Sequence, residues 1–206
     1  MRILFQGDSI TDAKRIYDNE VSLGVGYPLL VKSELGFAEP EKYEFLNKGV
    51  NGSRVVDLYA RIKSDIINLS PDVLSILIGV NDVWHNFWEK PNGVDAEKYF
   101  RVYNMLVEEI RAALPDVKIL ILEPFVLKEW ATAEKWDVFR AEVEKRAVCA
   151  RLVAKEHGLT FVPLQEGFDA LAKRAPVKCW TADGVHPTAL GHEFIKNEWL
   201  RAFYTL

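Results

Sequence analysis

Apolar residues occur along the chain in short runs that are separated by longer segments with helical spacing. The short runs are Ile3–Phe5, Tyr43–Leu46, Val73–Ile78, Val117–Leu122 and Leu159–Val162. Their β-branched, leucine and aromatic residues leave little polar surface on either face, which is typical of strands buried inside a parallel sheet. The pattern therefore predicts five strands.

The segments between these runs repeat apolar residues every three or four positions, as one face of a helix does. They include Val55, Leu58, Ile62, Ile66 and Leu69, then Tyr99, Tyr103, Leu106, Ile110 and Ala113, then Phe139, Val143, Ala147, Ala150 and Ala154, and finally Leu190, Phe194 and Trp199. Helices that connect parallel strands cover both faces of the sheet. We therefore expect an α/β fold: a three-layer α/β/α arrangement of the flavodoxin-like kind, with a five-stranded parallel sheet.

Two stretches lack either pattern. Trp84–Asp95 is rich in aromatic residues and in residues that break helices, so it is predicted to form a loop over the end of the third strand. Phe125–Glu134 is similar and follows the fourth strand. There is no internal repeat, low-complexity tract or linker, and residues 1–206 are expected to form a single domain.

Composition narrows the class of protein. The chain has 206 residues, 49% of them hydrophobic and 27% charged, with a formal net charge of −4. Its Lys and Arg residues are scattered, so the basic stripe that nucleic-acid binding needs is absent. The chain contains no run of about 18 apolar residues, so no membrane span is predicted. The segment Met1–Phe5 does not resemble a signal peptide. Cys149 and Cys179 are expected to be buried or half-buried thiols in a reducing compartment, so a cytoplasmic protein is expected.

The chemistry is expected where the strands end, because ligands of parallel α/β sheets bind beyond the carboxyl ends of the strands. Polar and glycine residues gather at these places: Gly7-Asp8-Ser9-Ile10-Thr11 after the first strand, Asn47-Lys48-Gly49-Val50-Asn51-Gly52-Ser53 after the second, Gly79-Val80-Asn81-Asp82 after the third, and Asp183-Gly184-Val185-His186-Pro187 before the last helix. We expect these four segments to meet at one edge of the sheet.

These residue types fit nucleophilic catalysis by a serine. Ser9 needs a base to take its proton, and His186 is the candidate. Asp183 lies three residues before His186, close enough on a turn to orient the imidazole and to stabilise its charged form. The oxyanion of a tetrahedral intermediate needs hydrogen-bond donors, which the Asn81 amide and the backbone N–H groups of Ser9 and Gly52 are predicted to provide.

The four segments resemble the four blocks of the SGNH, or GDSL-type, hydrolases, in the order and roughly the spacing of that family. The resemblance implies a serine esterase, with Ser9 as nucleophile, His186 as base and Asp183 as its partner. It also implies an oxyanion hole made by Ser9, Gly52 and Asn81.

A narrower resemblance, to the intracellular acetylxylan esterases of the family, depends on three stretches of sequence. They are Leu46-Asn47-Lys48-Gly49, Ile78-Gly79-Val80-Asn81-Asp82-Val83-Trp84 and Val185-His186-Pro187-Thr188-Ala189-Leu190-Gly191-His192. This resemblance implies a carbohydrate deacetylase that removes acetyl groups from xylo-oligosaccharides or related sugars, without cofactor or metal, and that assembles into homo-oligomers. Lys14-Arg15-Ile16-Tyr17 and the Phe87–Gly93 loop match the family poorly, so specificity is expected to differ there.

Three residues near these segments are candidates for substrate binding. Trp84 and Trp180 lie close to Asn81 and Asp183 in the sequence and are suited to pack against a sugar ring, but large aromatic residues at strand ends are often part of the core. Arg54 is suited to hold a hydroxyl or carboxylate of the substrate, and a solvated arginine is an equally good interpretation.

Other residues near the motifs have simpler interpretations. Asp8 is suited to tune the nucleophile, but a carboxylate that stabilises the turn is the simpler interpretation, and Asp82 has the same simple interpretation. His192 and Glu193 are expected at the surface or at an interface, since no further pair of metal ligands lies near them in the sequence. The aromatic segment Trp199–Tyr204 fits either an interface between subunits or packing within the chain.

Three other functions are alternatives to the serine esterase. A metal-dependent phosphoesterase needs several histidines and carboxylates around two cations, but the chain has only four histidines, and Asn81 is followed by Asp82 rather than by histidine. A carbohydrate-binding protein without activity is disfavoured by the intact set of Ser9, Asp183 and His186. A lysophospholipase or thioesterase acting on longer acyl chains stays open, because the sequence does not show whether an apolar channel exists.

Overall fold

The computed structural model describes residues 1–206, and its centre is one parallel sheet of five strands. The strands are β1 (Arg2–Gly7), β2 (Glu44–Asn47), β3 (Val73–Leu77), β4 (Lys118–Leu122) and β5 (Thr160–Val162). They lie in the order β2-β1-β3-β4-β5, and every neighbouring pair is parallel. This is the order of a flavodoxin-like, doubly wound sheet. The predicted fold class is confirmed, and all five predicted strands lie within two residues of those observed.

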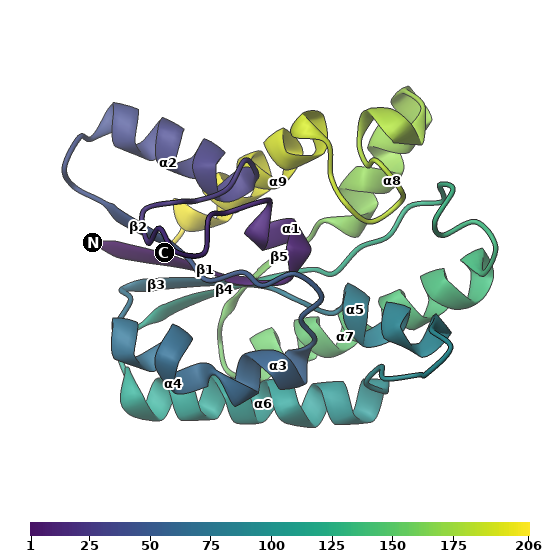
Figure 1. Ribbon diagram of the computed structural model, residues 1–206. Coiled ribbons are helices and arrows are strands. Elements are labelled where there is room, and N and C mark those ends of the chain that lie inside the picture. Colours follow the sequence, from purple (N-terminus) through teal and green to yellow (C-terminus); the bar gives the residue numbers. More distant parts are fainter.

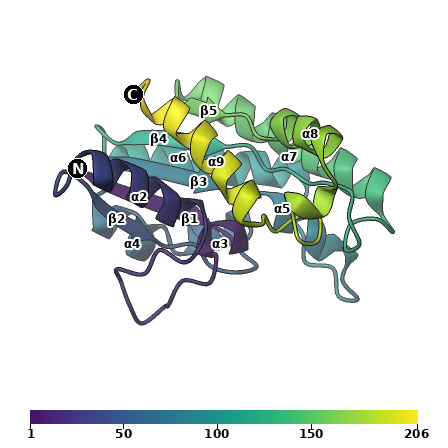
Figure 2. The same ribbon diagram turned by 90° about the horizontal axis from the view of Figure 1, so that it is seen from above.

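Helices cover both faces of the sheet (Figures 1 and 2). They are α1 (Ser9–Asp12), α2 (Tyr27–Ala38), α3 (Val55–Ala60), α4 (Ile62–Asp65), α5 (Val80–Trp84), α6 (Ala96–Ala113), α7 (Trp136–Glu156), α8 (Gln165–Arg174) and α9 (Ala189–Phe203). Single turns of 3₁₀ helix add Ile67–Leu69, His85–Phe87 and Val177–Cys179. Helices α2, α8 and α9 lie over one face, and α3, α4, α6 and α7 lie over the other (Figure 1). The result is three layers.

Each face of the sheet forms its own apolar core, because successive strand side chains point to opposite faces. Ile3 and Phe5 of β1 pack in the core beneath α2 and α9, whereas Leu4 packs in the core beneath α3 and α6. Trp199 of α9 is fully buried against the sheet, and its indole N–H donates to the Ser75 hydroxyl at 3.0 Å. The aromatic segment near the carboxyl terminus therefore packs largely within the chain.

Four helical regions differ from the predicted pattern. The segment 55–69 is not one helix: it breaks into α3, α4 and a 3₁₀ turn, although Val55 and Ile62 still face the same core. Helices α2 and α8 have no counterpart in the prediction. In α2 the apolar spacing is obscured by Leu29 and Phe37, which are exposed to solvent. The predicted loop from Trp84 is wrong at its start, since α5 ends at Trp84 and a 3₁₀ turn follows.

The loop after β4 and the two cysteines agree with the expectations. Residues 125–134 contain neither helix nor strand, as expected for a loop. Cys149 and Cys179 are free thiols of intermediate exposure. No helix is both long enough and apolar enough to cross a bilayer.

Candidate active site

Ser9 lies at the point where the strand order of the sheet reverses. The chain leaves β1 for β2 on one side and later returns to place β3 on the other, and such switch points are where doubly wound folds bind ligands. Ser9 is the first residue of α1, where backbone N–H groups have no acceptor within the helix. The Asp8 carboxylate caps this helix by accepting the Ile10 N–H at 3.0 Å. Asp8 thus stabilises the turn, as predicted.

A chain of hydrogen bonds connects Ser9 with His186 and Asp183. The Ser9 Oγ lies 2.9 Å from Nε2 of His186. The Nδ1 of the same ring lies 2.6 Å from Oδ2 of Asp183. The other carboxylate oxygen accepts the backbone N–H groups of Val185 and His186 at 2.9 and 2.8 Å. With its carboxylate fixed by the turn, Asp183 holds a proton on Nδ1 and leaves Nε2 free to accept the serine proton.

The groups around His186 and Asp183 shift the pKa values of both side chains. The hydrogen bond to Asp183 raises the pKa of His186 above its ordinary value of 6.5, although partial burial opposes this. Burial alone would raise the pKa of Asp183, but the hydrogen bonds from His186 and Val185 outweigh it and hold that pKa below 3.8. Burial raises the pKa of Asp8 to about 7, against the lowering effect of the Ile10 N–H and of nearby His186.

The loop after β4 holds the segment that carries Asp183 and His186. The Leu127 N–H donates to the Gly184 carbonyl at 2.8 Å, and the indole N–H of Trp130 donates to the Ala182 carbonyl at 3.1 Å. Gly184 has φ of +103°, and a Cβ there would lie 2.5 Å from the Leu127 carbonyl oxygen and 2.6 Å from the Thr132 hydroxyl. Only glycine allows this close approach.

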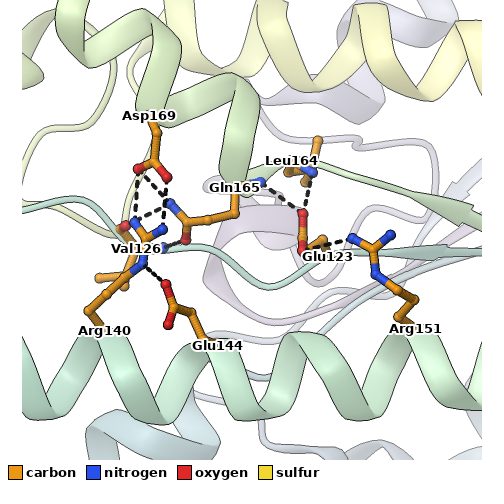
Figure 3. A network of polar contacts seen from close by, with 8 residues as sticks. All are labelled: Glu123, Val126, Arg140, Glu144, Arg151, Leu164, Gln165 and Asp169. Carbon is orange, nitrogen blue, oxygen red and sulfur yellow. Dashed lines mark hydrogen bonds and ion pairs between the residues drawn. The ribbon is translucent and has the colours of Figure 1, made fainter.

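Gln165 at the start of α8 in turn holds that loop (Figure 3). Its side-chain oxygen accepts the Val126 N–H at 2.9 Å, and its nitrogen donates to the Val126 carbonyl at 3.1 Å. Glu123, just after β4, accepts the N–H groups of Leu164 and Gln165 at 2.8 and 2.9 Å. The Gln165 amide and the Glu123 carboxylate are buried, and together they fix the loop after β4 that holds the Asp183–His186 segment.

Asn81 and Asp82, after β3, hold the segment that contains Gly52. The Asn81 amide donates to the Ser53 carbonyl at 3.2 Å. The buried Asp82 carboxylate accepts the Val55 N–H at 3.1 Å, where α3 begins, so it anchors a helix start rather than only its own turn. Gly52 has φ of +77°, and nothing lies within 4 Å of the position that a Cβ would take. This part of the backbone is open on the side that a side chain would otherwise cover.

A cavity of about 690 Å³ opens beside Ser9 and His186. Its wall consists mainly of polar side chains and of the loop that follows α1. The lining residues are Ser9, Asp12, Ala13, Lys14, Arg15, Tyr17, Val25, Asn51, His186, Pro187, Ala189 and His192. A second cavity of about 490 Å³, bounded by Met1 and Phe203, is lined by no Ser, Cys or His. No group of three or more His, Cys, Asp or Glu side chains is placed to hold a metal ion.

Comparison with known proteins identifies the family of the chain. Residues 5–194 match the model of the GDSL-like lipase/acylhydrolase family. The chain belongs to this family. An acetylxylan esterase from Geobacillus stearothermophilus is 33% identical over 97% of this chain and 92% of its own length. The crystal structure of a protein described as a GDSL-like lipase from Parabacteroides merdae has a TM-score of 0.91, with 36% identity over 98% of this chain and 94% of its own.

The crystal structure of Axe2, an acetylxylan esterase from Geobacillus stearothermophilus, is also similar. Its TM-score is 0.87, with 31% identity over 98% of this chain and 93% of its own. The family and these relatives identify the chain as an acylhydrolase, a carboxylic ester hydrolase of the GDSL family.

The three predicted substrate-binding residues lie outside the cavity. The ring of Trp84 lies 5.9 Å from the ring of His186, centroid to centroid. Arg54 is paired with Asp57 at 2.9 Å and donates to the Asn92 carbonyl. Trp180 is buried in the core, and its N–H donates to the Ala175 carbonyl at 3.3 Å. Trp84 therefore packs beside His186, whereas Arg54 and Trp180 are bonded to other parts of the chain.

The structure adds three cavity-lining residues to this GDSL-family site: two lie outside the motif stretches and the third, His192, ends one of them. Arg15 and Tyr17 line the cavity, in the segment that matches the family poorly. His192 lines it too and is only 7% exposed, so the prediction that it lies at the surface is wrong. The first turn of α9 brings it behind His186 and against the start of α2, a contact that the local sequence does not indicate. Glu193 is exposed, as predicted, and pairs with Lys196 at 2.9 Å.

Proposed function

We propose that this protein is a serine esterase that hydrolyses short-chain esters, in particular O-acetyl groups on xylo-oligosaccharides or related sugars. The observation that carries the proposal is the hydrogen-bonded chain from Ser9 through His186 to Asp183 beside the 690 Å³ cavity. The similarity to an acetylxylan esterase along nearly the whole chain supports the acetyl sugar as substrate class.

The proposed reaction proceeds through an acyl-enzyme. Ser9 Oγ attacks the ester carbonyl carbon while Nε2 of His186 takes the serine proton. The C–O bond to the alcohol then breaks, and His186 gives its proton to the departing oxygen. Water attacks the acyl-serine with His186 as base again, which releases the carboxylic acid and restores Ser9. Asp183 stays ionised throughout, because its pKa is held below its ordinary value.

The proposed oxyanion hole combines three donors. The Ser9 N–H is at the first position of α1 and has no acceptor within the helix. The Gly52 N–H donates to no group of the protein. The Asn81 amide uses one N–H for the Ser53 carbonyl, which orients the amide and leaves its second N–H for the substrate. Donors that are oriented in advance stabilise the developing negative charge without further reorganisation.

The test is acetate release from acetylated xylo-oligosaccharides by the wild type and by Ser9→Ala. We expect release by the wild type and a loss of several orders of magnitude in Ser9→Ala. Ser33→Ala is the matched control, because Ser33 is exposed on α2, away from the cavity. Near-native activity of Ser9→Ala would refute the proposal. A series of 4-nitrophenyl esters from acetate to decanoate measures acyl preference, and higher kcat/KM for the long chains would favour a lysophospholipase or thioesterase instead.

We also propose a cytoplasmic setting, supported by the two free thiols, Cys149 and Cys179. Proteins of reducing compartments commonly keep cysteines unpaired. Fractionation of the native host tests this, and recovery of the protein mainly from the culture medium would contradict it.

A further inference from the structure

The two sides of the Ser9–His186 pair differ in chemistry. On one side, the Trp84 ring lies against His186 and packs on Phe139 at 5.8 Å between ring centroids, and Phe87 packs on Phe139 at 5.2 Å. This side is apolar. On the other side lies the cavity, whose outer wall is the loop between α1 and α2. We call residues 13–26 the strap; it projects from the body of the molecule in Figure 2.

The strap is attached to the sheet at both of its ends. The Asn47 amide at the end of β2 donates to the carbonyls of Thr11 and Leu23 at 2.7 and 2.9 Å. The Val25 N–H donates to the Ala13 carbonyl at 2.8 Å and closes the base of the strap. Side chains that the strap directs toward the cavity are therefore held in place.

Arg15 is the first such side chain. Its Nε donates to the Gly49 carbonyl at 2.7 Å, and its guanidinium carbon lies 4.1 Å from the centroid of the Tyr17 ring. The Tyr17 hydroxyl donates to the Asp12 carboxylate, which fixes the ring beneath the guanidinium. Arg15 lines the cavity, and its two terminal nitrogens donate to no group of the protein. A guanidinium held in this way presents oriented donors to a ligand.

His192, on α9, is the second side chain that faces the cavity. Its Nδ1 accepts the Tyr27 N–H at 3.2 Å, so the ring proton is on Nε2. Burial and the nearby His186 lower the pKa of His192 to about 4, which keeps the ring neutral at ordinary pH. The Cε1 and Nδ1 atoms pack against Gly26. Nε2 has no partner in the protein and is not among the buried polar atoms, so its N–H faces the space that His192 lines.

The proposed mechanism decides which part of an ester enters this space. His186 must give its proton to the departing alcohol oxygen, so that oxygen lies next to Nε2 when the C–O bond breaks. The cavity begins at His186 and continues along Pro187 and Ala189. The alcohol portion therefore extends into the cavity, whereas the small acyl group remains on the side of Trp84.

We propose that the cavity binds a hydroxyl-rich alcohol portion of the ester, positioned by hydrogen bonds from the terminal guanidinium nitrogens of Arg15 and from Nε2–H of His192 to its oxygens. This inference depends on the proposed function, since it assigns the substrate's alcohol to the Ser9 site. The donors select for an alcohol with several oxygens, such as a sugar, over an aryl or alkyl alcohol of similar size.

The test measures binding of the alcohol product apart from turnover. Xylobiose is used as an inhibitor of 4-nitrophenyl acetate hydrolysis, and kcat and KM are measured for an acetylated xylo-oligosaccharide. The variants are Arg15→Leu, Arg15→Lys and His192→Phe. The last of these keeps an aromatic ring stacked on Tyr27 but removes both ring nitrogens. Arg101→Leu is the matched control, since Arg101 is exposed on α6 and distant from the cavity.

We expect Arg15→Leu to raise the inhibition constant of xylobiose and the KM of the sugar ester by about tenfold or more, as loss of a hydrogen bond from a charged donor does. The KM of Arg15→Leu for 4-nitrophenyl acetate should rise less than its KM for the sugar ester. Arg15→Lys should bind xylobiose more tightly than Arg15→Leu does. His192→Phe should raise the inhibition constant about threefold to tenfold. If thermal melting shows that His192→Phe does not fold, the arginine variants decide alone.

Two results would overturn the inference: no competitive inhibition of the wild type by xylobiose, or an inhibition constant in Arg15→Leu equal to that of Arg101→Leu. Failure of the proposed function gives a different result, namely aryl acetate hydrolysis that persists in Ser9→Ala. Ser9-dependent hydrolysis with unchanged xylobiose binding would refute only the assignment of the cavity.

Discussion

Gln165 connects α8 to the loop that holds Asp183 and His186, so its replacement should affect both stability and turnover. Gln165 and Val126 are both buried, and the side-chain amide pairs with both polar groups of the Val126 backbone. In Gln165→Leu the side chain keeps a similar size but can neither accept nor donate a hydrogen bond. The Val126 N–H and carbonyl would then be buried without partners (Figure 3).

The magnitude follows from these two groups. Each buried backbone group left without a partner costs about 1–3 kcal/mol, so we expect Gln165→Leu to lower the free energy of unfolding by about 2–6 kcal/mol. The next residue in the loop, Leu127, donates to the Gly184 carbonyl at 2.8 Å, one residue from Asp183. A shift of about 1 Å at catalytic groups costs on the order of 100-fold in rate. We therefore expect kcat to fall at least tenfold at a temperature where the variant is folded.

The assay is urea unfolding followed by fluorescence, together with kcat for 4-nitrophenyl acetate. Glu166→Leu is the matched control, because Glu166 is the exposed neighbour on the same helix and should change stability by no more than about 0.5 kcal/mol. Equal stability of Gln165→Leu and Glu166→Leu would refute the argument. A stability loss with unchanged kcat would refute the connection between Gln165 and His186.

Three further outcomes follow from the site. Asn81→Ala should lower kcat by about 10²–10³ if the amide donates to the oxyanion, which steady-state kinetics measures; a loss below threefold would contradict this. Since the pKa of His186 is raised above 6.5, kcat/KM should rise with pH through an apparent pKa above 6.5. In Asp183→Asn that apparent pKa should fall, because burial then lowers the pKa of His186 without the opposing carboxylate. A pH–rate profile of both proteins tests this, and an unchanged apparent pKa in the variant would count against it. Gly184→Ala should lower the free energy of unfolding by more than about 2 kcal/mol, because Gly184 has a positive φ and close contacts. Gly36→Ala in helix α2 is the control and should be neutral or stabilising, since nothing lies within 4 Å of the position of the added Cβ. Equal melting temperatures of the two variants would refute the steric argument.

The sheet could be predicted from the sequence because the information about it is local. A strand covered on both faces is a short apolar run, and the prediction for Val73–Ile78 differs from β3 by one residue. Helices were less predictable, since their burial depends on partners distant in the chain. Phe37 of α2 is 90% exposed, so the apolar spacing there does not mark the buried face.

The site also has parts that local sequence predicts and parts that depend on contacts distant in the chain. Ser9 and Asn81 follow the ends of β1 and β3, which are neighbours in the sheet, so their proximity follows from strand order. The contacts of His192 and Gln165 do not follow from strand order. The Tyr27 N–H bonded to His192 lies 165 residues away in the sequence, and Gln165 contacts a loop 39 residues before it. No spacing within a motif indicates such pairs.

The two carboxylates that act on His186 show why motif residues also need the fold for their chemistry. Asp183 is partly exposed and accepts three hydrogen bonds from the His186–Val185 turn, so its pKa is lowered despite burial. Asp8 is buried and accepts only the Ile10 N–H, and burial raises its pKa to about 7. Environments that push two carboxylates in opposite directions give them different functions in hydrolases. In the proposed mechanism, Asp183 is therefore the ionised partner that stabilises the imidazolium near neutral pH, whereas Asp8 contributes mainly through the helix start that presents Ser9.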